Sequence, residues 1–278
     1  MKGKFKLNHL IVHLILLVGV IVVVFPFAWM ILTSFKTSGE AMKIPPTIFP
    51  EKFVTTAYHT IVTSAIPFAT VYMNTIITTV VTTLVQIVFC SMAGYAFGRI
   101  EFPFKNAIFI LVLSVLMVPG QIFLLPQYQI VQKLGLLDTI PALFLPNLFS
   151  AFGTFLLRQF FMSLPKELEE AAIVDGAGLW VIISRIFAPI MGPSLVTTGL
   201  LAFIGAWNEF MFALTFIISN EQRTVPVAIG MLQGASQFEL PWGNIMAASV
   251  VVTLPIIVMV LIFQKRIVSG LTSGAVKG

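Results

Sequence analysis

Long apolar runs alternate with short polar segments along the whole chain. A helix needs about 20 apolar residues to cross the hydrocarbon core of a bilayer. The runs predict transmembrane helices at Leu10–Thr33, Val71–Phe97, Ala107–Ile130, Ile140–Leu157, Ser194–Ile218 and Asn244–Phe263. The pattern therefore predicts an all-α integral membrane protein with six transmembrane helices, organised as a single transmembrane domain over residues 1–278.

The first apolar run follows the basic stretch MKGKFKLNH, which is typical of the start of a signal peptide. Its apolar part is longer than the usual ~7–15 residues of such a peptide, and no A-x-A cleavage site follows it. We therefore interpret this run as an uncleaved first span.

Basic residues indicate the orientation of the spans. Six spans place both termini on the same side, and if that side is the cytoplasm, 11 of the 16 lysines and arginines lie inside and 5 outside. The positive-inside rule favours this arrangement. We therefore expect both termini and the loop 162–193 in the cytoplasm, with segments 34–70 and 219–243 on the outer side.

Composition agrees with a membrane protein and excludes several function classes. The 278 residues are 58% hydrophobic and only 10% charged, and the mean hydropathy is +1.01. Cys90 is the single cysteine and lies in an apolar run, so it predicts packing rather than chemistry. The histidines His9, His13 and His59 are too few and too scattered for a metal site, and the sequence has no G-x-x-x-x-G-K-[ST] loop for ATP.

Two polar features interrupt the predicted spans. Glu209, in WNEF, is the one formally charged residue well inside a span, and Asn208 precedes it. An intramembrane carboxylate indicates a functional site by default, although a glutamate that only locks helices together is the alternative. In the third span, MVPGQIFLLP places Gln121 directly after Pro119 and Gly120. This break predicts either a packing kink or a substrate contact.

The loop between spans four and five contains the acid-rich stretch EEAAIVDGAG, residues 169–178. Pro165 can open a helix there, the following glutamates suit the positive end of its dipole, and Asp175-Gly176 is a typical stop. Leu168, Ala171 and Ala172 are expected on one face, which predicts a small-residue surface for a protein partner rather than for lipid. A second helical run, Leu179 to Phe187, is expected to end at Pro189 and Pro193.

These residues resemble the EAA loop of membrane subunits in binding-protein-dependent ABC importers. ELEEAAIVDGAG followed by IFAPIMGPS matches the loop's fixed spacings. TSFK, AGYAFGR, VPGQIFLLPQY, LRQFF, WNEF and the tail GLTSGAVKG are similar to the carbohydrate branch of these permeases. The chain is most similar in shape to the shorter, six-span partner of the maltose-type pair, its G subunit.

The resemblance implies a type I ABC importer permease fold in a bacterial cytoplasmic membrane. The EAA loop would form a coupling helix in a cleft of a dimeric cytoplasmic ATPase, which binds ATP and Mg, and this chain would hold no cofactor of its own. The coupling residues would be Glu170, Ala171, Ala172, Asp175, Gly176 and Ala177. A second homologous permease, an extracytoplasmic solute-binding protein and the lipid bilayer are the expected partners, and nucleic acid is not. Residues 219–243 would reach toward the binding protein, and Asn208, Glu209 and Gln121 are candidate residues of the sugar path.

Two other functions are weighed against this interpretation. A self-sufficient secondary carrier or channel needs its own ion site and usually more spans or clear repeats, none of which the sequence contains. A membrane-embedded enzyme needs a nucleophile–base pair or a metal constellation, and the sequence offers neither.

Overall fold

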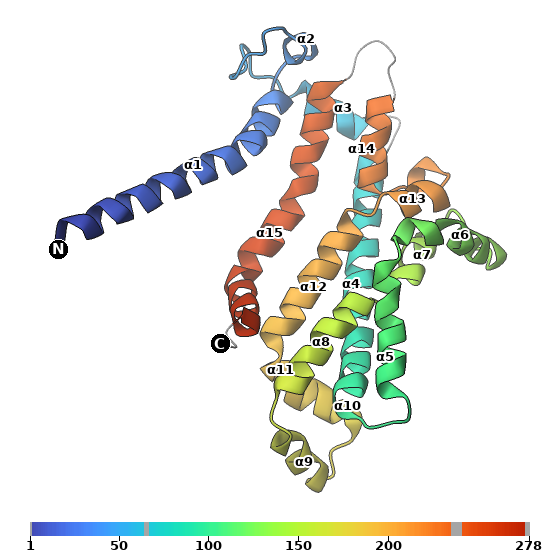
Figure 1. The fold of residues 1–278 in the computed structure, drawn as a ribbon. Coiled ribbons are helices and arrows are strands. Elements are labelled where there is room, and N and C mark those ends of the chain that lie inside the picture. Colours follow the sequence, from blue (N-terminus) through green and yellow to red (C-terminus); the bar gives the residue numbers. More distant parts are fainter. Residues whose placement is uncertain (1, 64–66, 235–240, 276–278) are drawn as a thin grey trace. The chain divides into compact units, whose positions relative to one another are not determined.

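The computed structural model describes residues 2–63, 67–234 and 241–275, with side chains described for 9–63, 67–232 and 241–265. These residues form helices joined by loops (Figure 1). The chain divides into two compact units, Met1–Phe68 with Ala228–Leu254 and Ala69–Val227 with Pro255–Gly278. Each unit is described by itself below.

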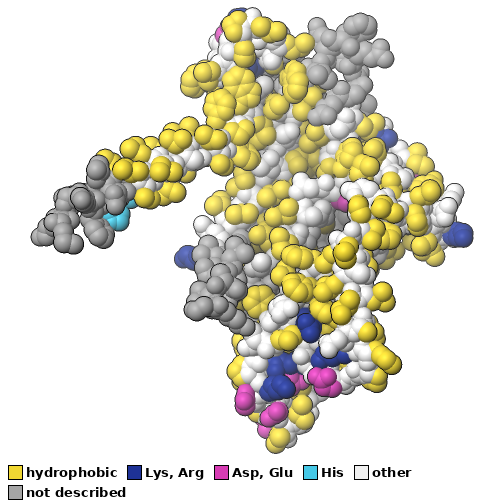
Figure 2. Space-filling model, viewed as in Figure 1, with side chains coloured by type: hydrophobic (Ala, Val, Ile, Leu, Met, Phe, Trp, Pro, Cys, Tyr) yellow, Lys and Arg dark blue, Asp and Glu magenta, His cyan; other side chains and the backbone are white. Residues whose placement is uncertain are grey.

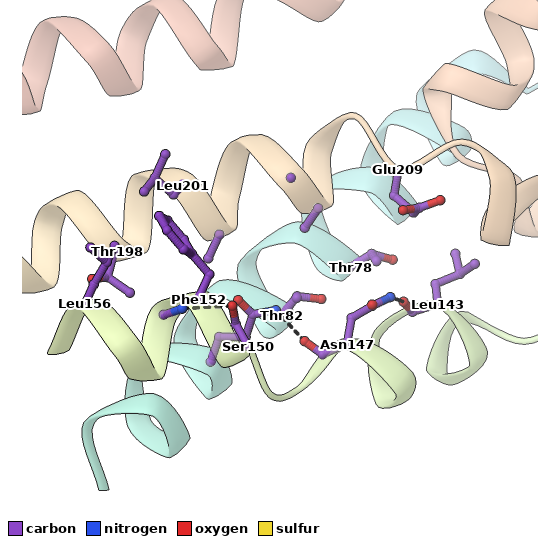
Figure 3. Close-up of a pocket in the computed structure, with 15 residues that line it drawn as sticks. Thr78, Thr82, Leu143, Asn147, Ser150, Phe152, Leu156, Thr198, Leu201 and Glu209 are labelled. Carbon is purple, nitrogen blue, oxygen red and sulfur yellow. Dashed lines mark hydrogen bonds between the residues drawn. The ribbon is translucent and has the colours of Figure 1, made fainter. Parts of the chain in front are cut away.

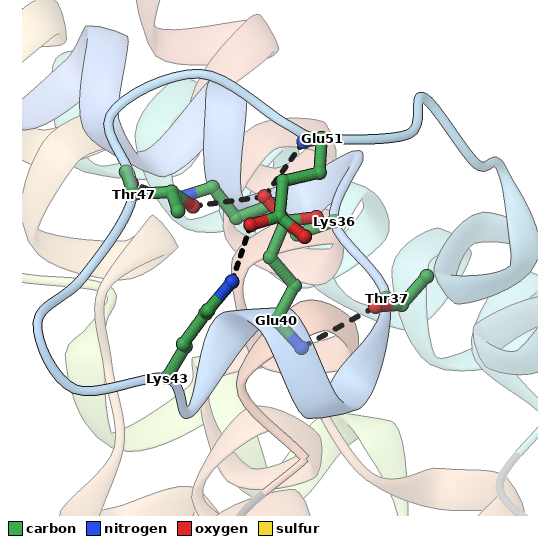
Figure 4. A network of polar contacts seen from close by, with 6 residues as sticks. All are labelled: Lys36, Thr37, Glu40, Lys43, Thr47 and Glu51. Carbon is green, nitrogen blue, oxygen red and sulfur yellow. Dashed lines mark hydrogen bonds and ion pairs between the residues drawn. The ribbon is translucent and has the colours of Figure 1, made fainter.

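The first unit contains three helices and parts of two others. They are α1 (Lys2–Ser34), α2 (Ser38–Ala41), α3 (Thr56–Thr63), the end of α14 (Val225–Gly234) and the start of α15 (Trp242–Ala275). Its loop is organised around the buried side chain of Glu40, whose Oε1 accepts hydrogen bonds of 2.8 Å from the Thr47 hydroxyl and from the Glu51 N–H (Figure 4). Desolvation raises the pKa of Glu40, but these two bonds and the charges of Lys36 and Lys43 outweigh it, so the pKa is lowered.

The second unit is the larger one and holds most of the helices. They are α4 (Phe68–Arg99), α5 (Lys105–Ser114), η1 (Val115–Met117), η2 (Gly120–Phe123), α6 (Leu124–Lys133), α7 (Ile140–Phe144), η3 (Leu145–Asn147), α8 (Ala151–Ser163), α9 (Glu167–Val174), α10 (Leu179–Val181), η4 (Ile182–Phe187), α11 (Ala188–Ile190), α12 (Gly192–Trp207), α13 (Met211–Phe216) and η5 (Asn220–Gln222). Among these, η4 is a π-helical stretch.

Among the residues that the structure describes, three helices are long and apolar enough to cross a bilayer alone: His9–Ser34, Phe68–Arg99 and Trp242–Lys265. They agree in position with the first, second and sixth predicted spans. The count rises to as many as six only if each of three bent helix pairs is one span. The number of helices long enough to cross a bilayer is therefore compatible with the predicted multi-pass arrangement.

The third, fourth and fifth predicted spans are not single straight helices. The pair Lys105–Met117 and Gly120–Lys133 bends by 97°, and the pair Ile140–Asn147 and Ala151–Ser163 bends by 45°. The first of these bends falls at Pro119, whose missing N–H and fixed φ end the helix as its position in the sequence predicts.

The predicted span Ser194–Ile218 divides into α12 and α13. Helix α12 ends at Trp207, with Asn208 as its C-terminal cap residue, and α13 begins at Met211. The Glu209 carboxylate accepts a 3.0 Å hydrogen bond from the N–H of Phe212, in the first turn of α13. Glu209 therefore lies at a break between helices rather than within a continuous helix.

Helices α4 and α8 approach closely where small residues face bulky ones. A Cβ added to Gly94 would lie 3.0 Å from both the N of Arg158 and the Cβ of Leu157. A Cβ on Gly98, one turn later, would lie 3.2 Å from that of Phe161. Small residues at four-residue spacing let helix backbones meet in membranes, so this spacing fixes the α4–α8 contact.

Candidate functional site

Helix α9 has the charge distribution and the end that its sequence predicts. Three glutamates lie in its first turn, where the positive end of the helix dipole stabilises them. At its other end Gly176 has φ +78°, the Gly176 N–H donates to the Ile173 carbonyl at 3.0 Å, and the Ala177 N–H donates to the Ala172 carbonyl at 2.9 Å. These two bonds form a Schellman motif, which explains the glycine at this position.

The inner side of α9 is tied to the end of α4. Ala172 is buried in a cluster with Tyr95. The Tyr95 hydroxyl donates to the Glu169 carboxylate, and Arg99 Nε lies 3.8 Å from the other oxygen of that carboxylate. Arg99 Nη2 also donates to the Leu164 carbonyl at 2.5 Å. Glu169 thus links α9 directly to the last turn of the long helix α4.

An aromatic cluster packs next to this link between α9 and α4. The rings of Tyr95, Phe161 and Phe187 lie 5.5 to 6.0 Å apart and come from α4, α8 and η4. The Arg99 guanidinium lies 5.6 Å from the Phe187 ring centroid. Displacing α9 therefore has to disturb packed groups on three helical segments.

The outer face of α9 differs from the predicted one. Ala172 is 6% exposed and belongs to the packed interior, whereas Leu168 and Ala171 are exposed as expected. Ile173 and Val174, 58% and 86% exposed, are the most exposed large apolar side chains of α9. Sequence reasoning missed both, because helical periodicity does not say which of two apolar faces turns inward.

The second helical run after α9 is longer than predicted. Helical structure continues from Leu179 through Ile190, and Ala188 donates its N–H to the carbonyl of Ile183, five residues earlier. Pro189 does not end the run, because it lies in the first turn of α11, where no N–H partner is needed. The break falls at Met191, after which the chain turns by 91° into α12.

A cavity of about 300 Å³ lies between α4, α8 and α12 (Figure 3). Its lining is rich in uncharged polar groups, and Glu209 is its one charged residue. The hydroxyls of Thr78, Thr82 and Thr198 are buried there and have no hydrogen-bond partner among the described residues. Phe152 adds an aromatic ring that is 46% exposed.

One wall of the cavity is held by hydrogen bonds at the break before α8. Gln86 Nε2 donates to the Asn147 carbonyl, and the Ser150 hydroxyl accepts from the Gly153 N–H at 3.0 Å and caps α8. Buried hydroxyls without partners are costly unless water or a ligand pairs with them. The cavity is therefore suited to a ligand rich in hydroxyl groups.

The three predicted path residues do not come together. Glu209 lines the cavity and is half-buried. Asn208 is exposed and its amide donates to the Ile204 carbonyl at 2.8 Å, while Gln121 is exposed in η2; neither lines this cavity. The threonines were missed, although those at 75, 78, 79, 82 and 83 form a polar stripe in an apolar helix that could have revealed them.

In the part of the chain that the structure describes, no three His, Cys, Asp or Glu side chains are close enough to hold a metal ion. The predicted outer segment 219–243 lies partly beyond this part, because residues 235–240 are outside the described ones. The described portion of it is tied to α4, since the Asn74 amide donates to the carbonyls of Glu221 and Arg223 at 2.7 and 3.0 Å. The side chains of the tail GLTSGAVKG also lie outside the described residues.

Two known proteins are similar to this chain over most of its length. The chain is 39% identical over 273 residues to the trehalose/maltose transport system permease protein MalG of Thermococcus litoralis, covering 96% of this chain and 97% of that protein. It is 42% identical over 213 residues to the trehalose transport system permease protein SugB of Mycobacterium tuberculosis, covering 76% of this chain and 78% of SugB.

A solved structure supports the fold independently. One chain of a bacterial ABC transporter involved in the import of the acidic polysaccharide alginate has a TM-score of 0.82 with 20% identity, over 95% of this chain and 98% of that one. At that identity the likeness concerns the fold. Residues 86–273 match the family described as the binding-protein-dependent transport system inner membrane component, and the chain is therefore a multi-pass membrane transport subunit that belongs to this family.

Proposed function

We propose that this chain is a permease subunit of an ATP-driven sugar importer and that α9 is its coupling helix. The observation that carries the proposal is α9 itself: a short acidic helix with exposed Ile173 and Val174, tied on its other side to α4 through Glu169. An exposed apolar patch rimmed by charge is typical of a protein-interaction surface. An ATPase that displaces α9 would move the end of α4, and α4 also lines the cavity.

The energy for transport would come from a separate cytoplasmic ATPase dimer that binds ATP and Mg. Glu170 on α9 and the Asp175-Gly176 turn with Ala177 after it would contact that ATPase. With six spans, this orientation would put both termini in the cytoplasm. A second permease would complete the transport path opposite the cavity, and a solute-binding protein would deliver the substrate at the outer side. The family description and the relatives' names support this class of assembly.

The cavity favours an uncharged oligosaccharide as substrate. Threonine hydroxyls and the Gln86 amide can pair with sugar hydroxyls, and an aromatic ring such as Phe152 can stack on a sugar face. Glu209 is the one charged residue of the lining, so an acidic sugar would meet repulsion there without a compensating cation. The sugar-transport names of the relatives agree with this substrate class.

The proposal is tested by uptake into vesicles that contain this chain, its candidate ATPase and its candidate second permease. Glu170→Arg places a cation on the exposed side of α9, and Gly176→Pro removes the left-handed turn after it. We expect either change to lower ATP-dependent sugar uptake by more than about tenfold, while the chain still inserts in the membrane. Lys133→Glu, an equal charge reversal on an exposed residue of α6, is the control and is expected to keep full uptake.

Two outcomes would contradict the proposal. Normal ATP-coupled uptake in both α9 variants would remove the coupling role from α9. Sugar uptake by this chain alone, without an ATPase, would instead favour the secondary carrier or channel.

A further inference from the structure

A second cavity of about 530 Å³ lies where α4 ends and α5 begins, beside the end of α8. Four of its lining residues are basic, Arg99, Lys105, Arg158 and Lys166, and one is acidic, Glu101. Figure 2 shows Lys and Arg side chains gathered at the end of the molecule where α9 lies. The cavity takes no part in the transport path or in the contacts of α9 with a partner described above.

Two of the four cations remain available for a ligand. Arg99 is engaged with Glu169, and Lys105 is paired with Glu101 at 3.1 Å. The Arg158 guanidinium uses its Nε to donate to the Phe97 carbonyl and lies 4.2 Å from the centroid of the Phe109 ring. These two contacts hold the guanidinium in place, but the hydrogen bond engages only Nε. The other guanidinium nitrogens remain available. The Lys166 ammonium has no partner among the described residues.

The first turn of α5 adds further positive character. Its N-cap residue, Phe104, offers no side-chain hydrogen bond, so the N–H groups of Asn106 and Ala107 remain for another acceptor. Both residues line the cavity. Helix N-termini with free N–H groups favour phosphate oxygens, because the helix dipole and the donors point the same way.

The surface next to the cavity is apolar rather than polar. Phe104 at the loop is 80% exposed, and Ile110 and Leu111 on α5 are 66% and 69% exposed. Met162, which lines the cavity, is 51% exposed. The cavity lies where α4 ends and α5 begins, so if these helices cross a bilayer it would lie at the bilayer boundary, with the apolar surface of α5 leading into the hydrocarbon region.

We propose that this cavity binds the phosphate of an anionic phospholipid, with the acyl chains along the exposed apolar side of α5. A phosphate group matches the guanidinium of Arg158, the ammonium of Lys166 and the free N–H groups of α5. Basic pockets at the ends of transmembrane helices are typical sites for such headgroups. The apolar surface favours a lipid over a free phosphate ion, which could not use it. The inference requires only that α4 and α5 cross the bilayer and does not depend on the proposed transport function.

The test uses the full-length chain, purified in a neutral detergent and stripped of lipid. Native mass spectrometry measures the retention of phosphatidylglycerol and of phosphatidylcholine added at equal concentration. We expect phosphatidylglycerol to be retained at least fivefold better. In the double variant Arg158→Gln, Lys166→Gln, retention should fall by about fivefold for each cation removed.

Two variants keep the result interpretable. Lys52→Gln with Lys133→Gln removes the same charge from two exposed residues outside the cavity and should retain the lipid as the parent chain does. Lys166→Gln alone changes an exposed side chain that has no partner among the described residues, so the fold should be kept. Retention should fall by about fivefold. This single variant serves as the test if loss of Arg158 disturbs the fold.

Three results would overturn the proposal. The first is equal retention of the two lipids, and the second is loss of phosphatidylglycerol in the control as large as in the cavity variant. The third is displacement of the lipid by inorganic phosphate at the same concentration, which would make the cavity a phosphate site rather than a lipid site. Since neither sugar nor ATPase enters the assay, a failure of the transport proposal would leave its outcome unchanged.

Discussion

Each end of the second unit contains a carboxylate in polar contacts, but the groups that contact it differ between the two ends. At one end Asp138 Oδ1 accepts from the N–H groups of Ile218 and Ser219 and from the Ser219 hydroxyl, at 2.8 to 2.9 Å. At the other end Glu169 is bound by side chains of α4 and by no backbone donor among the described residues. Backbone donors cannot leave without moving the chain, whereas side chains can rotate. The Asp138 end is therefore fixed, and the α9 end is able to move.

The largest expected effect on stability comes from Asp138→Ala. The change removes three hydrogen bonds to a charged acceptor and places alanine at φ +60°, where aspartate and asparagine are better tolerated. We expect a loss of about 3 kcal/mol in the free energy of unfolding in detergent. Asp138→Asn keeps an acceptor and the backbone tolerance and should lose about 1 kcal/mol or less. Equal losses in the two variants would contradict the fixed-end interpretation.

A smaller effect on stability, with a larger one on function, is expected for Glu169. Glu169→Ala removes the carboxylate that Tyr95 and Arg99 contact and should cost about 1 kcal/mol of unfolding free energy, since water can reach this end. ATP-coupled uptake should fall more than stability suggests, because α9 loses its direct link to α4. A double-mutant cycle of Tyr95→Phe and Glu169→Gln measures the coupling energy between them. A coupling energy near zero would show that the link contributes nothing.

The pH dependence of stability separates the two ends further. The hydrogen bonds from Ser219 and Ile218 lower the pKa of Asp138 below its ordinary value of 3.8. A lowered folded-state pKa stabilises the protein above the unfolded-state pKa, and this stabilisation is lost as the pH falls through the folded-state pKa. The unfolding temperature of the parent chain should therefore fall more between pH 6 and pH 3 than that of Asp138→Asn. An equal fall in unfolding temperature in the two chains would show that Asp138 does not contribute to the acid sensitivity.

The smallest effect is expected in the first unit, at the exposed ion pair between Lys43 and Glu51. Lys43→Gln removes this pair, and exposed ion pairs contribute little because solvent screens them. The unfolding temperature should stay unchanged within error. A clear decrease would mean that the pair, rather than the backbone donor of Glu51, holds the Glu40 loop in place.

The sequence predicted the elements whose signals are local. The apolar runs at both termini and at 71–97 appear as long helices, and Asp175-Gly176 ends α9 because only a residue tolerant of positive φ suits that turn. Pro119 also marks a break in the third span, as expected from its missing N–H. Local backbone chemistry was enough for these features.

Features that depend on tertiary packing could not be predicted in the same way. Hydropathy does not mark the break at Asn208 and Glu209, because apolar residues continue on both sides of it. The inward turn of Ala172 and the outward turn of Val174 depend on the aromatic cluster beneath α9. The cavity depends on α4, α8 and α12 meeting, so its threonines were visible in the sequence only as a stripe without a partner.

The π-helical stretch η4 has a consequence for chain length. Its six residues contain hydrogen bonding to the fifth residue back, which accommodates one more residue than an α-helix of the same rise would. Deleting one residue between Ile182 and Phe187 would restore α-helical bonding, because the π-helical turn holds the extra residue. The helical segments before and after it would keep nearly the same faces. This segment can therefore lose one residue without redirecting α9.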